Sequence, residues 1–452
     1  MDFEPTIVEK SIVVLLVAIN FIITYIYFRL ITPGTKWILP SSIFVLYYNI
    51  SYPLKTLYII NPIFEIHTFH YFTCSDLILA LLYSTVFFTC FISIFLFLIR
   101  KYAFNLPNGI NIMRGSANLK VAVYIFTILY FIGFYTKYSI LSYYGFLEIE
   151  VSRTVFENMI INLSTIWPAV LLLSLVYKNK YPLRFGCLSV IVISFVVLEI
   201  LLSTHKAIII IFAITYLIYC NINYKEVSIP FMFLLGIVAV VIFIYSYAAR
   251  FSAITYYRMD ISSVVITLSS LVETFYQFQD RILGSFFDRF ELVDNLIYTM
   301  QRVNYLDLGY YKFGSLAEIF NLIPSIFWPE RPEINLNIFV NREILGTGFE
   351  KVTSSIGRIG ESYLIFGCAG VTFGFLYGLL FFLAYYYLFY NPKNSLYTFI
   401  YLYLFFSYFI FDDYFFQSLF TICFVSISII VVFLIVQISM SLKSNNYTLT
   451  VE

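Results

Sequence analysis

The chain has 452 residues, of which 61% are hydrophobic and only 12% are charged. Soluble globular chains carry about 25% charged residues, so this composition excludes an ordinary soluble protein and predicts an all-α polytopic membrane protein. The net charge of +1 excludes a general attraction for nucleic acid. The six cysteines lie apart without CxxC spacing, so neither a disulfide framework nor a zinc site is expected.

Apolar runs of about 20 residues predict about eleven transmembrane helices. They fall near 11–31, 38–60, 77–99, 119–136, 159–177, 183–203, 207–222, 229–249, 363–390, 394–411 and 415–438. The first run has no small-residue cleavage site, so we expect a spanning helix there and not a signal peptide. No internal repeat is visible, which argues against an inverted-repeat transporter.

Basic residues in the connections predict the orientation, because cytoplasmic loops carry an excess of Lys and Arg. Twelve basic residues lie on one set of connections: Arg29, Lys36, Arg100, Lys101, Arg114, Lys120, Lys178, Lys180, Arg184, Lys225, Lys393 and Lys443. The opposite short connections carry fewer, so the first set is expected to be cytoplasmic. The N-terminus is then outside and the C-terminus in the cytoplasm.

One stretch, 250–361, breaks the apolar pattern. It holds 10 of the 27 Lys and Arg residues and 13 of the 26 Asp and Glu residues. Charge beside lipid is costly, so this insert is expected to be a functional segment on the outer face. The predicted organisation is therefore eight spans in 1–249, a large outer loop in 250–361, and three spans with a short tail in 362–452.

The first part of the insert, from Asp260 to about Arg302, has apolar residues at helical spacing and a polar stripe on another face. The stripe includes Glu273, Asp280 and Asn295. This pattern predicts an amphipathic helix that lies on the bilayer surface or covers a cavity. The alternative is a packed helix whose polar stripe meets water.

The second part, from Lys312 to Glu361, is not helical in pattern, since prolines and glycines interrupt it throughout. It still contains large apolar residues, including Ile326, Phe327 and Trp328, and so is not a disordered linker. We expect a folded, irregular loop that reaches the membrane surface and lines a cavity.

A set of short motifs lies in and just after this region: Gly314 to Leu316, Ile323-Pro324, Trp328 to Pro332, Thr353 to Ser355, Gly360 to Tyr363, Phe366-Gly367 and Gly370. These motifs resemble those of the Wzy-type oligosaccharide repeat-unit polymerases. That family is similar in having ten to fourteen spans and a large outer loop toward the C-terminal half. The motif covers about 60 residues, and the similarity of topology covers the whole chain.

A shorter match lies at Leu202 to Ala207, in the outer turn between the sixth and seventh predicted spans. In the family this turn often holds an arginine beside the lipid pyrophosphate, where this chain has Lys206. Lysine binds phosphate as a point charge without the bidentate fork of arginine. Lys206 either binds the pyrophosphate or extends its charge to the membrane interface.

The resemblance implies a reaction in the bacterial inner membrane. A growing glycan on undecaprenyl pyrophosphate is transferred to a sugar hydroxyl of a new lipid-linked repeat unit, for O-antigen, capsule or exopolysaccharide. The partners implied are the lipid-linked oligosaccharide, the bilayer, a chain-length regulator and a flippase. No cofactor and no metal are expected.

Such a transfer needs cations that stabilise the departing pyrophosphate. Arg331 and Arg358 lead because they lie in the motif, and Pro329 and Pro332 hold Arg331 in a rigid turn. The further candidates are Lys206, Arg250, Arg289 and Arg342. Alternatively, Arg331 is a surface residue paired with a neighbouring glutamate.

The acceptor hydroxyl also needs a base. Glu361 and Glu273 are the leading candidates, and Asp280 is the third. Glu361 precedes the ninth predicted span, where a helix N-terminus favours a carboxylate. The alternative is that Glu361 serves only as a helix-end acid.

Two other functions fit the composition. An O-antigen ligase would use the same donor, but such enzymes usually have a histidine in the large loop, and 250–361 contains none. A flippase would move lipid-linked sugars without chemistry and would place charges in many helices. Intramembrane charge here is nearly limited to Glu199, which either faces a substrate cavity or hydrogen-bonds to a neighbouring helix.

Overall fold

The computed structural model describes ten stretches of the chain and a few isolated residues. The stretches are 5–31, 40–61, 72–102, 117–144, 164–178, 181–203, 229–251, 292–322, 335–346 and 356–390. The isolated residues are 211–212, 215–216, 219–220, 269, 273, 276, 328, 330 and 434.

The described stretches are almost entirely helical and contain no strand, which confirms the all-α prediction. The long apolar helices are α1 (Ile7–Ile31), α4 (Cys74–Tyr102), α5 (Ala117–Tyr144), α7 (Trp167–Lys178, after the 3₁₀ turn η2, Ser164–Ile166), α8 (Pro182–Ser203), α10 (Ile229–Phe251) and α16 (Phe373–Tyr390). Between α1 and α4, α2 (Pro40–Asn49) continues through a π-helical turn, η1 (Ile50–Leu54), into α3 (Lys55–Ile60).

Four described segments are long and apolar enough to cross a membrane: Ile7–Ile31, Cys74–Tyr102, Pro182–Glu199 and Gly357–Leu383. The chain is therefore a membrane protein, as its composition predicted. Helices in the described residues coincide with eight predicted spans, from 11–31 to 183–203, at 229–249 and at 363–390. The runs 394–411 and 415–438 lie almost entirely outside the described residues, so the count of eleven stays a prediction.

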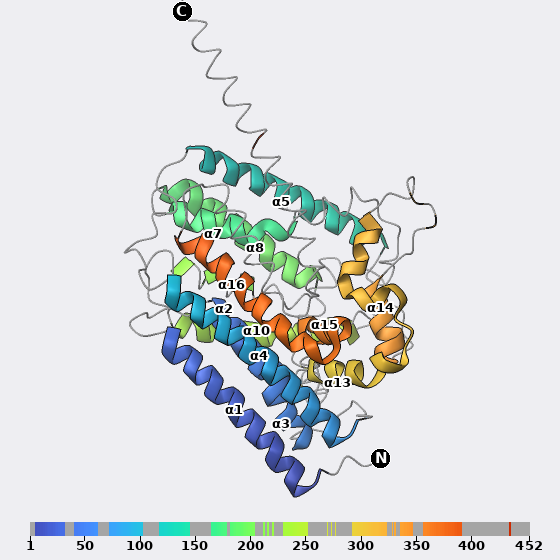
Figure 1. The fold of residues 1–452 in the computed structure, drawn as a ribbon. Helices are drawn as coiled ribbons and strands as arrows, with labels where there is room; N and C mark the ends of the chain where they lie inside the picture. The colour runs from blue at the N-terminus through green and yellow to red at the C-terminus, as the bar shows by residue number, and fades with distance from the viewer. Residues whose placement is uncertain are drawn as a thin grey trace, which may run out of the picture.

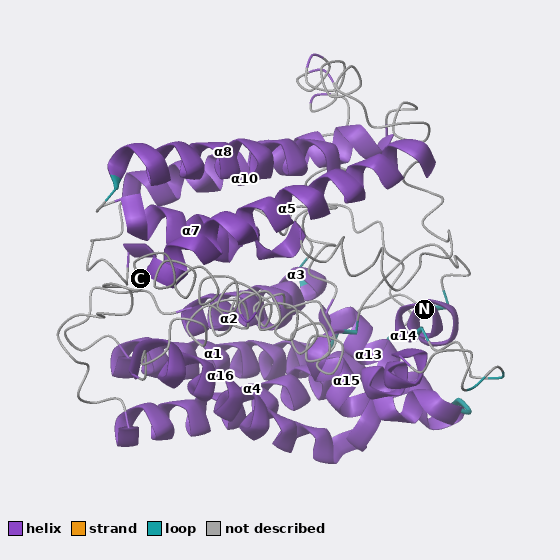
Figure 2. Cartoon of the chain, turned by 90° about the horizontal axis from the view of Figure 1, so that it is seen from above, coloured by secondary structure: helices purple, strands orange, loops and turns teal. Residues whose placement is uncertain are grey.

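The helices form two groups (Figure 2). One contains α1, α4 and α16, and the other contains α5, α7, α8 and α10, with α2 and α3 between them. The apolar core is built from residues such as Phe88, Phe91 and Phe95 of α4, which are at most 1% exposed. The first group is held close because Gly374 and Gly378 of α16 face the backbone of α4, where any side chain would overlap it.

The helices α1, α4 and α16 run in the same direction. Asn20 of α1 donates to Thr85 of α4 at 2.7 Å, and Tyr27 stacks with Phe95 about two turns further along α1 and about three turns further along α4. At the end of α16, Phe382 lies against Tyr102 of α4. The basic C-terminal turns of α1 and α4, which carry Arg29, Arg100 and Lys101, therefore lie at one shared end.

The described part of the insert gathers at the other end of the bundle, where α4 begins (Figures 1 and 2). It consists of α13 (Leu292–Arg302), two 3₁₀ segments, η4 (Val303–Tyr305) and η5 (Gly309–Leu322), then α14 (Leu336–Phe339) with its π-helical continuation η6 (Val340–Leu345). The next helix, α15 (Gly357–Phe366), continues through the 3₁₀ segment η7 (Gly367–Thr372) into α16.

One expectation for the insert was wrong. The stretch from Lys312 to Glu361 is helical wherever the structure describes it apart from a few flanking residues, because its glycines separate short helices and do not abolish them. Of the predicted amphipathic stretch, the structure describes α13 and three isolated helical residues, and the polar residues Asp294 and Asn295 of α13 are each only 6% exposed. Because α13 packs between α4 and α15, the alternative of a packed helix holds for these residues.

Candidate functional site

The first turns of α15 bury three polar side chains where the insert meets the long helices. Arg358, Glu361 and Ser362 are 5%, 1% and 1% exposed. Arg358 and Glu361 are three residues apart in a helix, so they lie on the same face. Burial of an arginine and a glutamate is uncommon unless their charges are compensated, and this marks α15 as the leading candidate site.

Ser315 of η5 holds the carboxylate of Glu361. Its backbone N–H donates to Oε1 of Glu361 at 2.8 Å, and its hydroxyl donates to the same oxygen. Two donors on one oxygen complement a negative charge. Through Ser315, η5 is therefore connected directly to the candidate base, Glu361.

Gly314 makes this contact possible. Its φ of +58° lies in the left-handed region that favours glycine, and it turns the chain so that Ser315 faces Glu361. A Cβ atom at position 314 would lie 2.9 Å from Oε1 of Glu361 and 2.8 Å from Ile365. A side chain here would both strain the backbone and displace the carboxylate.

The guanidinium of Arg358 lies against an aromatic ring. Its Cζ atom is 4.8 Å from the centroid of the Tyr377 ring, which belongs to α16 and is 1% exposed. A cation over the face of an aromatic ring is stabilised by the ring quadrupole, more strongly where water is excluded. This contact holds the cation in an apolar setting close to Glu361.

A second contact connects α15 to α4. The hydroxyl of Tyr83 lies 3.1 Å from the hydroxyl of Ser362 and donates to the backbone carbonyl of Gly367 at 3.3 Å. The ring of Tyr83 also meets Tyr363 edge to face. The site is thus supported from one side by the insert and from the other by a long apolar helix.

Glu361 was expected to precede a helix, but the helix begins earlier than expected. Because α15 starts at Gly357, Glu361 is its fifth residue. The helix dipole acts mainly within the first turn, so it does not account for the position of this carboxylate. Its described polar contact is with Ser315 instead.

The other candidates have different surroundings. Arg342 of η6 has a side chain 61% exposed, with its Nε 2.6 Å from Oε1 of Glu343. Glu273 is helical and exposed, and Arg250 lies in the last turn of α10. The remaining candidates lie outside the described residues: Lys206, Asp280, Arg289 and Arg331.

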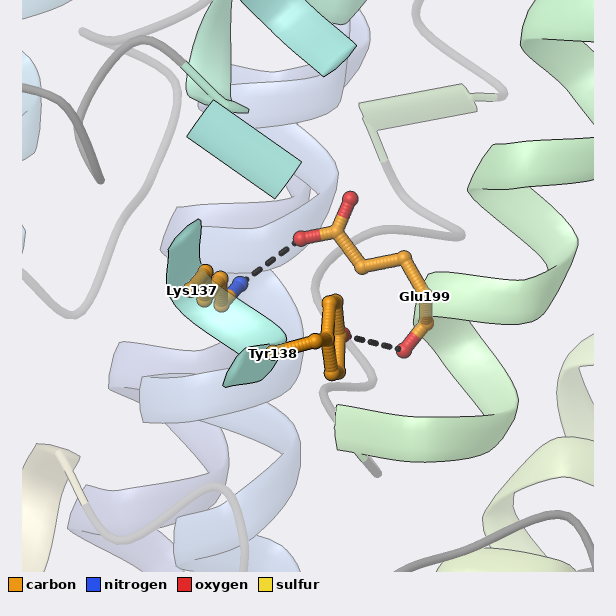
Figure 3. A network of polar contacts seen from close by, with 3 residues as sticks. All are labelled: Lys137, Tyr138 and Glu199. Carbon is orange, nitrogen blue, oxygen red and sulfur yellow. Dashed lines mark hydrogen bonds and ion pairs between the residues drawn. The ribbon is translucent and has the colours of Figure 1, made fainter. Parts of the chain in front are cut away.

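Glu199 of α8 forms an ion pair with the neighbouring helix α5. Its Oε1 lies 2.7 Å from Nζ of Lys137, and Tyr138 donates to its backbone carbonyl at 3.3 Å (Figure 3). The alternative in which Glu199 bonds to a neighbouring helix is therefore confirmed. The side chains of Lys137 and Glu199 are 20% and 4% exposed, so this is a largely buried pair in an apolar layer.

Sequence reasoning missed several participants. Ser315 lay within the motif but received no role, and Tyr83 stood in an apolar run with no distinguishing pattern. Lys55 stands inside the predicted span 38–60 and received no role, yet its ammonium lies 3.7 Å from the carboxylate of Asp294. A charge inside an apolar run is the signal that could have identified Lys55.

The arrangement brings a buried cation and a buried carboxylate to one helix face, beside a serine from the insert. Such a pair can stabilise an anionic leaving group and accept a proton. Among the described residues no group of three His, Cys, Asp or Glu side chains is placed to hold a metal ion. Comparison of the chain with protein-family models, with curated proteins and with solved structures finds no match in any of the three.

Proposed function

We propose that the chain is a glycan polymerase of the bacterial inner membrane. It transfers a growing oligosaccharide from undecaprenyl pyrophosphate to a sugar hydroxyl of a new lipid-linked repeat unit. The observation that carries this proposal is the burial of Arg358 and Glu361 on one face of α15, with Ser315 of the insert on the carboxylate. The motif similarity to Wzy-type polymerases supports it, since both residues lie in that motif.

The reaction breaks the bond between the anomeric carbon of the donor glycan and the pyrophosphate oxygen. A new bond forms between that carbon and the acceptor hydroxyl oxygen, and the hydroxyl proton passes to Glu361. The pyrophosphate leaves with the bonding electrons, and Arg358 stabilises its negative charge. A water-poor site strengthens both interactions.

Glu361 is 1% exposed, so the acceptor reaches it only after η5 separates from α15. We take the contact of Ser315 with the carboxylate of Glu361 as the closed state of this proposed cycle. Closure between turnovers keeps water from the base and limits hydrolysis of the donor.

The proposed orientation places the insert and the N-terminus outside the cell and the C-terminus in the cytoplasm. In support, the described part of the insert lies at the end of the bundle where α1 and α4 begin (Figure 1). Arg29, Arg100 and Lys101 lie at the C-terminal ends of α1 and α4, at the opposite end. Basic residues are enriched on the cytoplasmic side.

A second candidate function is a flippase for lipid-linked oligosaccharides. The observation that favours it is the pair of Lys137 and Glu199 between α5 and α8. Ionisable residues within apolar helices often mark a transport path. A flippase would act without Glu361 as a base. Loss of the Glu361 carboxylate would therefore inactivate a polymerase, whereas loss of the pair of Lys137 and Glu199 would inactivate a flippase.

The test uses purified protein in proteoliposomes supplied with lipid-linked repeat units, and a ladder gel that resolves glycan length. Glu361→Gln is expected to reduce extension by about 100-fold or more, because a positioned base contributes on the order of 10²–10⁴ in rate. Tyr305→Ala, which removes an exposed side chain from η4 of the same insert, is the control and should extend normally.

Normal ladders from Glu361→Gln would contradict the assignment of the base. A wild-type protein that moves lipid-linked units across the bilayer without lengthening them would instead favour the flippase. Transfer only to a lipid A core acceptor would favour the ligase. A topology reporter fused at residue 320 that signals from the cytoplasm would refute the orientation.

A further inference from the structure

A buried ion pair connects the insert to the second apolar segment of the chain. Nζ of Lys55, the first residue of α3, lies 3.7 Å from Oδ2 of Asp294 in α13. The two side chains are only 1% and 9% exposed. The ammonium also lies 5.4 Å from the centre of the Tyr58 ring, which adds a cation–π contact.

Stability alone does not account for such a pair. Removing two charges from water costs about as much as their attraction returns, and well-packed apolar residues often stabilise as much or more. The best-attested use of a buried pair is to select one register of packing over others. Lys55 also follows directly on the π-helical turn with Pro53, and such turns are frequent at functional sites.

From Asp294 the connection continues to the candidate site. Leu292, two residues earlier in α13, lies against Gly357, the first residue of α15. Gly357 has φ +63°, and a Cβ atom there would lie 2.9 Å from Cδ2 of Leu292. The position of α13 therefore determines where α15 begins, one residue before Arg358.

The other end of α13 is held as well. Gln301 donates from Nε2 to Oδ2 of Asp76 in the first turn of α4, at 2.8 Å. With Lys55 at one end and Asp76 at the other, α13 is fixed to two apolar segments from the first half of the chain.

We propose that Lys55 and Asp294 are a positioning pair that sets the register of α13, and through Leu292 and Gly357 the placement of Arg358 and Glu361. This inference rests on the proposed function for its catalytic consequence. Neither residue touches the reacting groups. Their effect is on the geometry of α15, where a displacement of about 1 Å costs on the order of 100-fold in rate.

The test replaces the pair by apolar residues of similar size in the full-length protein, Lys55→Met with Asp294→Leu. This double variant avoids the unpaired buried charge that a single substitution leaves, and it should retain wild-type yield and Tm. We expect kcat for extension to fall by about 100-fold with little change in KM. Asp294→Glu keeps the charge and should retain most of kcat.

An independent readout is hydrogen exchange of the α15 backbone, measured by mass spectrometry in nanodiscs. The double apolar variant should exchange these amides about tenfold faster than wild type, since the register of α13 is no longer selected. The control is Tyr305→Ala, which removes an exposed side chain from η4 of the same insert and should change neither kcat nor exchange.

Wild-type kcat in the double apolar variant, or unchanged exchange of α15, would overturn the proposal. If the wild-type protein extends no lipid-linked substrate, the proposed function fails and the exchange measurement alone decides this inference. Should the double apolar variant fold poorly, Lys55→Gln with Asp294→Asn removes both charges and keeps polar side chains, and it should also show faster exchange of α15 and a lower kcat. Unchanged exchange and kcat in that variant would then overturn the proposal.

Discussion

Ser315 donates two hydrogen bonds to a single carboxylate oxygen of Glu361, one from its backbone and one from its hydroxyl. The two residues belong to different elements, because Ser315 lies in η5 and Glu361 lies in α15, the helix that leads into α16. In the proposed cycle, opening and closing of the site depends on this contact, which a substitution of the Ser315 side chain can change.

We predict that Ser315→Ala shifts the protein toward the open state. The substitution removes one donor to a charged acceptor, worth about 1.5 kcal/mol, or roughly tenfold in the equilibrium between closed and open forms. The measurement is the rate at which a water-soluble carbodiimide modifies the carboxyl of Glu361, which should rise about tenfold. Ser194→Ala removes an exposed hydroxyl from α8 and is the control.

An unchanged rate of modification in Ser315→Ala would show that this hydroxyl does not hold the site closed. A slower rate would contradict the closed state itself, because removal of a hydrogen-bond donor should make the carboxyl of Glu361 more accessible to the reagent and not less.

Arg358 gives a prediction about charge and shape. Arg358→Lys keeps the positive charge but loses the planar fork that matches phosphate oxygens. We expect extension to fall by about tenfold in Arg358→Lys and by about 100-fold or more in Arg358→Gln, because loss of one donor to a developing anion costs on the order of 10²–10³. Ladder gels at saturating substrate measure both.

Tyr377→Phe separates the contribution of the aromatic ring beneath Arg358 from that of the Tyr377 hydroxyl. It retains the ring beneath the guanidinium, so extension should stay near the wild-type rate. If Arg358→Gln extends as fast as wild type while remaining folded, the guanidinium has no part in the reaction.

The long helices could be predicted from the sequence because apolar composition over about 20 residues is a local property. The placement of Arg358 and Glu361 on one helix face was not predicted, because both residues had been assigned to a stretch without helical pattern, whereas α15 places them three residues apart in one helix. The contacts of Lys55 with Asp294 and of Ser315 with Glu361 could not be predicted. These contacts join segments that are far apart in the sequence. A periodic pattern shows which face of a helix is buried, but it does not show which element packs against that face.

The start of α15 was misplaced for a related reason. Gly357 and Gly360 suggested an interrupted loop, because isolated glycines weaken a helix. In the structure, Gly357 opens the helix at a point where Leu292 leaves no space for a side chain. Tertiary packing thus decided a boundary that composition alone assigned to a loop.

The contact between α16 and α4 predicts a sharp dependence on residue size. Gly374→Leu would force a side chain against the carbonyl oxygen of Phe87, and the helices would have to separate. Overpacking of this kind destabilises by about 1–3 kcal/mol or more. We therefore expect a lower Tm in detergent. Gly236→Leu on α10, where no heavy atom lies within 4 Å, should leave the Tm unchanged.

Equal values of Tm for these two leucine variants would mean that α16 and α4 do not pack through the glycine face. Gly374→Ala is the milder step and should lie between wild type and Gly374→Leu, since its single methyl group requires a smaller separation of the helices.

The pair of Lys137 and Glu199 separates structural from transport roles. Lys137→Met leaves the carboxylate of Glu199, which is 4% exposed, without this ion pair. Breaking a buried pair on one side costs about 3 kcal/mol, whereas an exposed pair such as Arg342 with Glu343 contributes about 0–1 kcal/mol. The free energy of unfolding should fall far more in Lys137→Met than in Arg342→Ala.

Lys137→Met combined with Glu199→Leu should restore much of the lost free energy of unfolding, because no unpaired charge remains. If the restored double variant still extends glycans, the pair is structural. If it folds normally yet no longer moves lipid-linked units across the bilayer in a protein that otherwise does so, the pair belongs to a transport path.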